Sequence, residues 1–153
     1  MPTLTETIIF ATQCHDGQTD KAGAPYILHP LRVLGYLGHQ ATSEERELAL
    51  LHDVMEDCGV TDEDLRYRGY GEPVIEALHF LSKLPGEEAD TECGYERFIE
   101  RCAANPLAAR VKLADLSDNM DRSRLGLPTP KDLVRLEKYR KAVDVLKGRS
   151  SST

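Results

Sequence analysis

The sequence lacks the features that would place the protein in a membrane or outside the cell. No apolar run approaches the ~20 residues that a membrane-spanning helix requires, and the first residues have neither the basic start nor the apolar stretch of a signal peptide. The four cysteines are well separated and never spaced as Cys-x-x-Cys, which does not fit a zinc knuckle or a disulfide framework. We therefore expect a cytoplasmic protein with reduced thiols and no membrane partner.

Positive charge is also scarce. The chain has 19 Lys and Arg residues against 26 Asp and Glu residues, a formal net charge of −7, and no long basic run. This charge balance argues against a protein that binds the phosphate backbone of nucleic acids. A small anionic substrate is compatible with it, because a metal ion or a local group of lysines and arginines can attract phosphate. The sequence leaves the oligomeric state open.

No segment shows the alternating pattern of a half-buried strand, and no internal repeat or domain linker interrupts the chain. Apolar residues instead recur with helical spacing almost throughout, and 153 residues are enough for one domain with a core. The sequence therefore predicts an all-α fold. We expect a single helical bundle over residues 1–148, followed by a flexible C-terminal tail at residues 149–153.

Caps, prolines and glycines set the expected helix boundaries. The first helix should cover residues 5–15, and its expected inward positions are Ile8, Ile9, Ala11 and Thr12. The expected N-caps of later helices are Thr42, Thr61 and Thr129. Further helices are expected after Pro30 and at residues 74–81, 95–103 and 106–119, with a structured loop at 17–30 and an acidic surface loop at 85–91.

The most informative stretch is His52-Asp53-Val54-Met55-Glu56-Asp57. On one continuous helix of ~3.6 residues per turn, His52 lies beside Glu56 and Asp53 beside Asp57. The apolar residues before and between them make this helix half-buried. Burying several carboxylates is costly unless each is paired or bound to a metal, so a divalent metal is the simplest explanation.

Two further places in the sequence can complete such a site. His29 precedes Pro30, and because proline disfavours helical geometry in the preceding residue, we expect His29 in an extended junction before a helix. Asp115 and Asn119 lie four residues apart on the helix expected at 106–119, with Lys112 one turn earlier. Imidazole with carboxylate suits Mn²⁺, Fe²⁺ or Zn²⁺ better than Ca²⁺. The candidate metal ligands are His29, His52, Asp53 and Asp115.

Three separated blocks of the sequence, in this order, resemble one known family. They are Gly17-Gln18 … Lys21 … Gly23 … Pro25-Tyr26-Ile27 … His29-Pro30, then Leu50-Leu51-His52-Asp53-Val54 … Glu56-Asp57, then Lys112-Leu113-Ala114-Asp115 … Asn119-Met120. They resemble the alarmone hydrolases of the RelA/SpoT type, within the HD superfamily of metal-dependent phosphohydrolases, over residues 10–145. The resemblance implies a small stand-alone hydrolase whose residues 1–148 form a single HD-domain helical bundle.

The resemblance also implies a role for each matched residue. One Mn²⁺, or another divalent transition metal, would be held by His29, His52, Asp53 and Asp115. Glu56 and Asp57 would position or deprotonate the attacking water. The implied substrate-binding residues are Lys21, Tyr26, Lys112, Asn119, Arg135 and Tyr139.

The implied reaction is the metal-dependent removal of the 3′-pyrophosphate from guanosine 3′,5′-bis(diphosphate), ppGpp, which gives GDP and pyrophosphate. Two alternatives remain open. One is an HD phosphohydrolase that acts on another nucleotide, such as an adenosine alarmone or a nucleoside phosphate. The other is a non-catalytic HD module that binds a nucleotide and signals to a partner. The Glu56-Asp57 pair favours an enzyme, because a binding module does not need to activate water.

The chain departs from the family pattern where the substrate's phosphates would lie. Asp20 stands where the family has the arginine of an Arg-Lys pair, and Leu116-Ser117-Asp118 replaces the usual Arg-Leu-His. Residues 83–105 form a short segment without a clear Arg-Lys cluster, which leaves Arg97 and Arg101 as candidate phosphate contacts. The predicted metal ligands are therefore complete, whereas the phosphate-binding residues differ.

Overall fold

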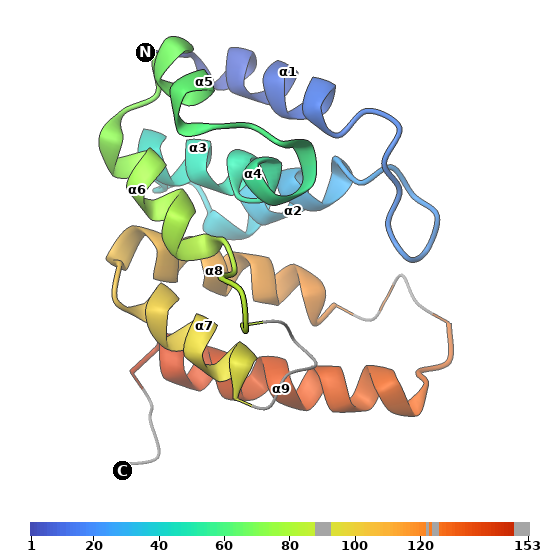
Figure 1. The fold of residues 1–153 in the computed structure, drawn as a ribbon. Helices are drawn as coiled ribbons and strands as arrows, with labels where there is room; N and C mark the ends of the chain where they lie inside the picture. Colours follow the sequence, from blue (N-terminus) through green and yellow to red (C-terminus); the bar gives the residue numbers. More distant parts are fainter. Residues whose placement is uncertain (88–92, 122, 124–125, 149–153) are drawn as a thin grey trace.

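Helices joined by turns make up the regular structure of the chain (Figure 1). A computed structural model describes residues 1–87, 93–121, 123 and 126–148. Within these residues the remaining regular feature is an isolated bridge between Thr19 and Pro25, so the predicted all-α fold is confirmed. The helices are α1 (Leu4–Cys14), α2 (Leu28–Leu37), α3 (Ser43–Leu51), α4 (Val54–Cys58), α5 (Asp62–Tyr67), α6 (Glu72–Leu81), α7 (Gly94–Ala103), α8 (Pro106–Asn119) and α9 (Pro130–Leu146).

Capping boxes fix the starts of α1, α3, α5 and α9. The predicted caps Thr42, Thr61 and Thr129 are confirmed: each threonine hydroxyl accepts a hydrogen bond from the backbone N–H three residues on, and the acidic side chain there accepts one from the cap's N–H. Thr3 caps α1 in the same way, so α1 begins one residue earlier than predicted. Each box pairs two backbone N–H groups that the first turn of a helix leaves without partners.

Helix α8 lies in the middle of the bundle. It packs against α2, α3, α6, α7 and α9, and Figure 1 shows α9 crossing one end of the molecule alongside α7. Large side chains with almost no exposed surface fill the core, including Leu48, Leu51, Leu78 and Phe98. Because α2 and α3 both contact α8, His29, His52 and Asp115 are brought to the same region.

The predicted inward face of the first helix is wrong at two positions. Ile9 and Thr12 face solvent, and the buried residues of α1 are Thr7, Phe10 and Ala11. Thr7 can occupy an inner position because its hydroxyl accepts a hydrogen bond from Tyr70 Oη at 2.9 Å and donates one to the Thr3 carbonyl at 3.1 Å. A buried hydroxyl with both partners carries no large desolvation cost.

His29 lies in a helix and not in the predicted extended junction. Helix α2 begins at Leu28, so His29 and Pro30 both belong to its first turn. A proline there costs no hydrogen bond, because the first backbone N–H groups of a helix have no helical partner. The backbone N–H of His29 donates to the Tyr26 carbonyl at 2.9 Å, and its imidazole is held by Asp118, which together fix its conformation.

The helix predicted to carry the whole acidic motif is interrupted at its most important residues. Helix α3 ends at Leu51, His52 and Asp53 form a turn, and α4 starts at Val54. His52 Nδ1 donates to the Ala49 carbonyl at 2.7 Å, which replaces the hydrogen bond that a continuing helix would supply. The expectation of one continuous helix through His52 and Glu56 is therefore wrong. Asp53 and Asp57 remain one helical turn apart, because the Asp57 N–H donates to the Asp53 carbonyl at 2.9 Å.

Some sequence predictions fall on residues whose structure is not described. The tail at residues 149–153 and most of the acidic loop at 85–91 lie outside the described residues. The domain boundaries and the cytoplasmic location stay predictions. None of the described helices is both long enough and apolar enough to cross a bilayer.

Removing the N-cap of α3 tests how strongly the cap supports the segment that leads to His52. Thr42→Ala is expected to lower the free energy of unfolding by about 1 kcal/mol, because the N–H of Glu45 loses its acceptor. Chemical denaturation measures the change. Ser43→Ala removes a neighbouring exposed hydroxyl and serves as the control. Equal stabilities of the two variants would contradict the proposed weight of this cap.

Candidate metal centre and substrate cavity

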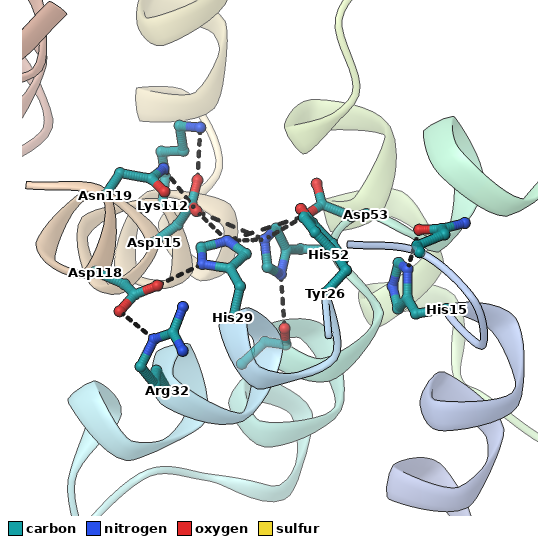
Figure 2. A network of polar contacts seen from close by, with 12 residues as sticks. His15, Tyr26, His29, Arg32, His52, Asp53, Lys112, Asp115, Asp118 and Asn119 are labelled. Atoms are coloured by element: carbon teal, nitrogen blue, oxygen red, sulfur yellow. Dashed lines mark hydrogen bonds and ion pairs between the residues drawn. The ribbon is translucent and has the colours of Figure 1, made fainter. Parts of the chain in front are cut away.

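The side chains of His29, His52, Asp53 and Asp115 converge between α2, α8 and the turn after α3 (Figure 2). His29 Nε2 lies 2.9 Å from Asp115 Oδ1 and 3.3 Å from His52 Nε2. Asp53 Oδ2 lies 3.0 Å from His52 Nε2 and 4.0 Å from His29 Nε2. Ligand atoms of His29, His52 and Asp115 all lie within 4.8 Å of one another, and these three residues can hold a metal ion. Asp53 lies outside that group but beside it, through its contact with His52.

Hydrogen bonds fix which nitrogen of each imidazole faces the other predicted ligands. His52 Nδ1 lies 2.7 Å from the Ala49 carbonyl, and His29 Nδ1 lies 2.6 Å from Asp118 Oδ2. A carbonyl and an ionised carboxylate only accept hydrogen bonds, so each Nδ1 carries a proton. In the neutral imidazoles both Nε2 atoms then present lone pairs 3.3 Å apart. Facing lone pairs repel unless a proton or a cation lies between them, and a metal ion meets that need.

The electrostatics of the cluster favour a cation at the same place. Burial alone would lower the pKa of His29 and His52, but the neighbouring carboxylates outweigh it and both pKa values rise. Burial would raise the pKa of Asp115, but Lys112 and the two histidines outweigh it and the pKa is lowered. Two imidazoles with two carboxylates form a ligand set suited to Mn²⁺, Fe²⁺ or Zn²⁺. The residues present fit a divalent transition metal.

Asp118 and Arg32 hold the His29 ring at its Nδ1 side, away from the predicted metal ligands, as Figure 2 shows. Asp118 Oδ2 accepts from His29 Nδ1 at 2.6 Å, and Asp118 Oδ1 accepts from Arg32 Nε at 2.7 Å. Asp118 is fully buried, and its contacts with Arg32 and His29 outweigh burial and lower its pKa. From the sequence, Asp118 was identified only as a departure from the family pattern. Its position three residues after Asp115, on the same helical face, was the signal that could have identified it.

A cavity of about 460 Å³ opens beside this cluster. Its volume falls in the range of small-molecule sites. The cations among its lining residues are Lys21, Arg32, Lys83, Lys112, Arg135 and Lys138. Arg32, Lys83 and Lys138 were not predicted from the sequence, because they come from separate segments that only the fold brings together. The cavity can therefore take an anionic ligand of nucleotide size.

Lys112 and Asn119 line the cavity and also hold Asp115. Lys112 Nζ donates to Asp115 Oδ2 at 2.7 Å, and Asn119 Nδ2 donates to Asp115 Oδ1 at 3.1 Å. Burial would lower the pKa of Lys112, but the charge of Asp115 outweighs it and the pKa rises. These two predicted substrate contacts therefore orient a predicted metal ligand, with all three residues on α8.

Tyr26, in the loop between α1 and α2, lies beside the predicted metal ligands. Its hydroxyl donates a short hydrogen bond to Asp53 Oδ2, and its ring lies 5.7 Å from the ring of His29 and 4.9 Å from that of His15. Burial and the charge of Asp53 raise the pKa of Tyr26, so it remains a neutral donor. Tyr26 lines the cavity, but its hydroxyl is engaged in orienting Asp53, and its contact with substrate stays a prediction.

The structure places Glu56 and Asp57 in α4, outside the set of described residues that line the cavity. Glu56 Oε1 accepts a hydrogen bond from the backbone N–H of Lys83 at 2.5 Å. Partial loss of hydration and the charge of Asp53 raise the pKa of Asp57. The charge of Asp53, a predicted metal ligand, thus acts on Asp57. Glu56 instead anchors the segment after α6. Their action on water stays a prediction.

The acid at position 20 has a structural use. Asp20 Oδ1 accepts hydrogen bonds from the backbone N–H groups of Ala22 and Ala24, both at 2.9 Å, which closes the turn that presents Lys21. Desolvation and the charge of Arg135 lower the pKa of Lys21. The loop after α1 and the start of α9 therefore bring Lys21 and Arg135 together at the cavity. Tyr139, one turn after Arg135, also lines it.

Arg97 and Arg101, the candidate phosphate contacts, are engaged elsewhere. Arg101 bonds to the carboxylate of Glu87 and to the carbonyls of His79 and Ser82, at distances of 2.5 to 3.2 Å. Arg97 donates to the Gly86 carbonyl at 3.3 Å. Neither is among the described residues that line the cavity. Both side chains hold the segment after α6 against α7, and the expectation of phosphate contacts is not supported by their positions.

Comparison with known proteins matches the chain to much longer enzymes. A guanosine-3′,5′-bis(diphosphate) 3′-pyrophosphohydrolase from Vibrio cholerae is 36% identical over 124 residues, which covers 76% of this chain and 17% of the relative. A protein of the same name from Aquifex aeolicus is 34% identical over 117 residues, 72% of this chain and 16% of the relative. This chain is a relative of the RelA/SpoT-type hydrolases.

The Escherichia coli bifunctional (p)ppGpp synthase/hydrolase SpoT is also similar, with 33% identity over 124 residues, 76% of this chain and 17% of SpoT. No family model matches the chain. The resemblance to the RelA/SpoT type that the three sequence blocks indicated is confirmed. Because the chain spans 17% or less of these relatives' length, its own activity has to be inferred from its residues.

Asp118→Asn is expected to weaken Mn²⁺ binding about 10- to 100-fold, because the carboxylate that fixes the Nδ1–H form of His29 becomes a neutral amide. Isothermal titration calorimetry with metal-free protein measures the affinity, and circular dichroism verifies folding. Asp16→Asn, which neutralises an exposed carboxylate in the loop after α1, is the matched control and should bind Mn²⁺ like the unaltered protein.

A second variant separates orientation from simple charge loss. Arg32→Gln leaves the Asp118 carboxylate and its hydrogen bond to His29 in place but removes the guanidinium that donates to Asp118 Oδ1, so a smaller loss of Mn²⁺ affinity is expected. If Asp118→Asn bound Mn²⁺ as tightly as the unaltered protein, the positioning role of Asp118 would be refuted.

Proposed function

We propose that this protein is an Mn²⁺-dependent phosphohydrolase of the HD superfamily that removes the 3′-pyrophosphate from guanosine 3′,5′-bis(diphosphate). The observation that carries the proposal is the convergence of two imidazole nitrogens and two carboxylate oxygens beside a cavity with six cationic lining residues. Relatives matched over 72% to 76% of the chain bear the name of this activity, which supports the substrate.

His29, His52, Asp53 and Asp115 would hold the metal. When bound, such an ion lowers the pKa of coordinated water and offsets negative charge on a phosphate. Around it, Tyr26 and Asn119 keep the two carboxylates oriented through their hydrogen bonds. The raised pKa of Lys112 keeps its ammonium charged, so it can stabilise charge that develops on the phosphate during cleavage.

The Glu56–Asp57 pair would handle the attacking water. The raised pKa of Asp57 suits a proton acceptor, because general-base catalysis improves as the pKa of the base approaches the working pH. Glu56, through its hydrogen bond to the Lys83 backbone, would fix Lys83 at the cavity wall. The two acids would therefore contribute differently: Asp57 through the proton and Glu56 through the position of a cation.

The remaining phosphates would be bound by cations from three separate segments. Lys21 comes from the loop after α1, Lys83 from the segment after α6, and Arg135 and Lys138 from α9. They supply positive charge where the family's arginine is replaced by Asp20. Tyr139 offers an aromatic surface at the same wall, which suits stacking against a nucleobase.

A nucleotide panel tests the proposed reaction. Purified protein with Mn²⁺ is expected to release pyrophosphate and GDP from ppGpp, and ion-exchange chromatography measures both products. Asp53→Ala should lose both metal binding and turnover. If phosphate or pyrophosphate is released only from adenosine alarmones or nucleoside phosphates, the proposed substrate is wrong and the phosphohydrolase activity stands. Tight nucleotide binding without turnover would identify a binding module and refute the enzyme.

Asp57→Asn is expected to keep Mn²⁺ affinity and to lower kcat about 100-fold or more, because the proton acceptor is lost. Glu56→Ala should also keep the metal but lower turnover, because the Lys83 N–H loses the acceptor that fixes Lys83 at the cavity wall. Steady-state kinetics and calorimetry on the same preparations separate the two effects. Glu63→Gln, at an exposed acid of α5, is the matched control. Unchanged turnover in Asp57→Asn would remove Asp57 from the mechanism.

A further inference from the structure

Tyr95 lies in the first turn of α7 and is one of the cavity-lining residues. Its ring centroid is 6.2 Å from that of Phe98 and 6.2 Å from that of Tyr139, and Lys138 Nζ lies 4.6 Å from the ring. The residue is only 7% exposed. Side chains of α7 and α9 thus hold the ring in a fixed position at the cavity wall.

The hydroxyl of Tyr95 is buried and has no hydrogen-bond partner among the described residues. Two other tyrosines differ: Tyr70 donates to Thr7 Oγ1 at 2.9 Å, and Tyr26 donates to Asp53. Leaving a buried hydroxyl unpaired costs stability, so buried polar groups in folded proteins are nearly always paired. At a cavity wall, an atom of a bound ligand can supply the missing partner.

The charges around Tyr95 define what that partner is. Burial raises the pKa of Tyr95, and Lys112 is the main opposing charge, so the phenol stays protonated and presents a donor. Lys112 and Lys138, near the same ring, add positive charge on this side of the cavity. A neutral donor beside ammonium groups complements an anionic acceptor, and phosphate oxygen is the acceptor that the cavity's cations favour.

We propose that Tyr95 is a substrate-binding residue whose hydroxyl donates a hydrogen bond to a phosphate oxygen of the bound ligand, next to Lys112. The inference rests on the proposed function only in taking a phosphorylated ligand, and it does not depend on which nucleotide is cleaved. It adds a neutral contact, contributed by α7, to a phosphate site otherwise made of cations. Such a contact selects a phosphate oxygen by the geometry of the hydrogen bond and not by charge.

The test removes one oxygen atom and compares two buried tyrosines. Tyr95→Phe is expected to bind inorganic pyrophosphate about tenfold more weakly, measured by calorimetry at a fixed Mn²⁺ concentration. Its melting temperature should be unchanged or raised, because no internal hydrogen bond is lost. Tyr70→Phe, the matched control, loses a hydrogen bond to Thr7, so its melting temperature should fall while pyrophosphate affinity is unchanged.

Two outcomes would overturn the proposal for Tyr95: equal pyrophosphate affinity of Tyr95→Phe and the unaltered protein, or no pyrophosphate binding by either. Kinetics with ppGpp keep this result separate from the proposed function. If ppGpp is hydrolysed and Tyr95→Phe changes neither KM nor pyrophosphate affinity, Tyr95 is excluded and the reaction stands. If ppGpp is not hydrolysed but Tyr95→Phe weakens pyrophosphate binding, Tyr95 is supported and the substrate is wrong.

Discussion

The buried carboxylate of Asp115 is the constraint on which the rest of the site depends. Removing a carboxylate from water costs several kcal/mol unless partners replace its hydration, and Asp115 is 4% exposed. Its partners come from three places: Lys112 and Asn119 on α8, His29 on α2, and His52 in the turn after α3. Satisfying this one group therefore fixes how three segments meet, and it places α8 at the centre of the bundle.

Both irregularities that the sequence did not predict occur where chain segments adjust to this cluster. The break after Leu51 lets His52 turn its Nδ1 onto the Ala49 carbonyl and its Nε2 toward Asp115. The helical conformation of His29, against the preference of a residue before proline, directs its Nδ1 onto Asp118. Local propensity fails at these two residues because tertiary contacts with charged groups outweigh a bias of about 1 kcal/mol.

What could be predicted from sequence follows from the range of each interaction. The caps at Thr42, Thr61 and Thr129 involve partners three residues away, so their pattern is local and was predicted. The four residues predicted as metal ligands were identified from the family motifs, which are also patterns in the sequence. The pairing of Arg32 with Asp118, 86 residues apart, and the gathering of Lys83 and Lys138 at one cavity depend on the packing of whole helices, which no local pattern contains.

An acidic chain can still bind an anion at this cavity because the carboxylates there are paired with hydrogen-bond donors and cations of the protein itself. Asp20 is held by backbone N–H groups, Asp53 by Tyr26 and His52, and Asp118 by Arg32 and His29. The cations at the rim, in contrast, repel one another: the charge of Arg135 contributes to the lowered pKa of Lys21. A bound phosphate would relieve this repulsion. It would act alongside Asp132, whose carboxylate lies 3.9 Å from Arg135 Nη1 and whose charge opposes the lowering of the Lys21 pKa.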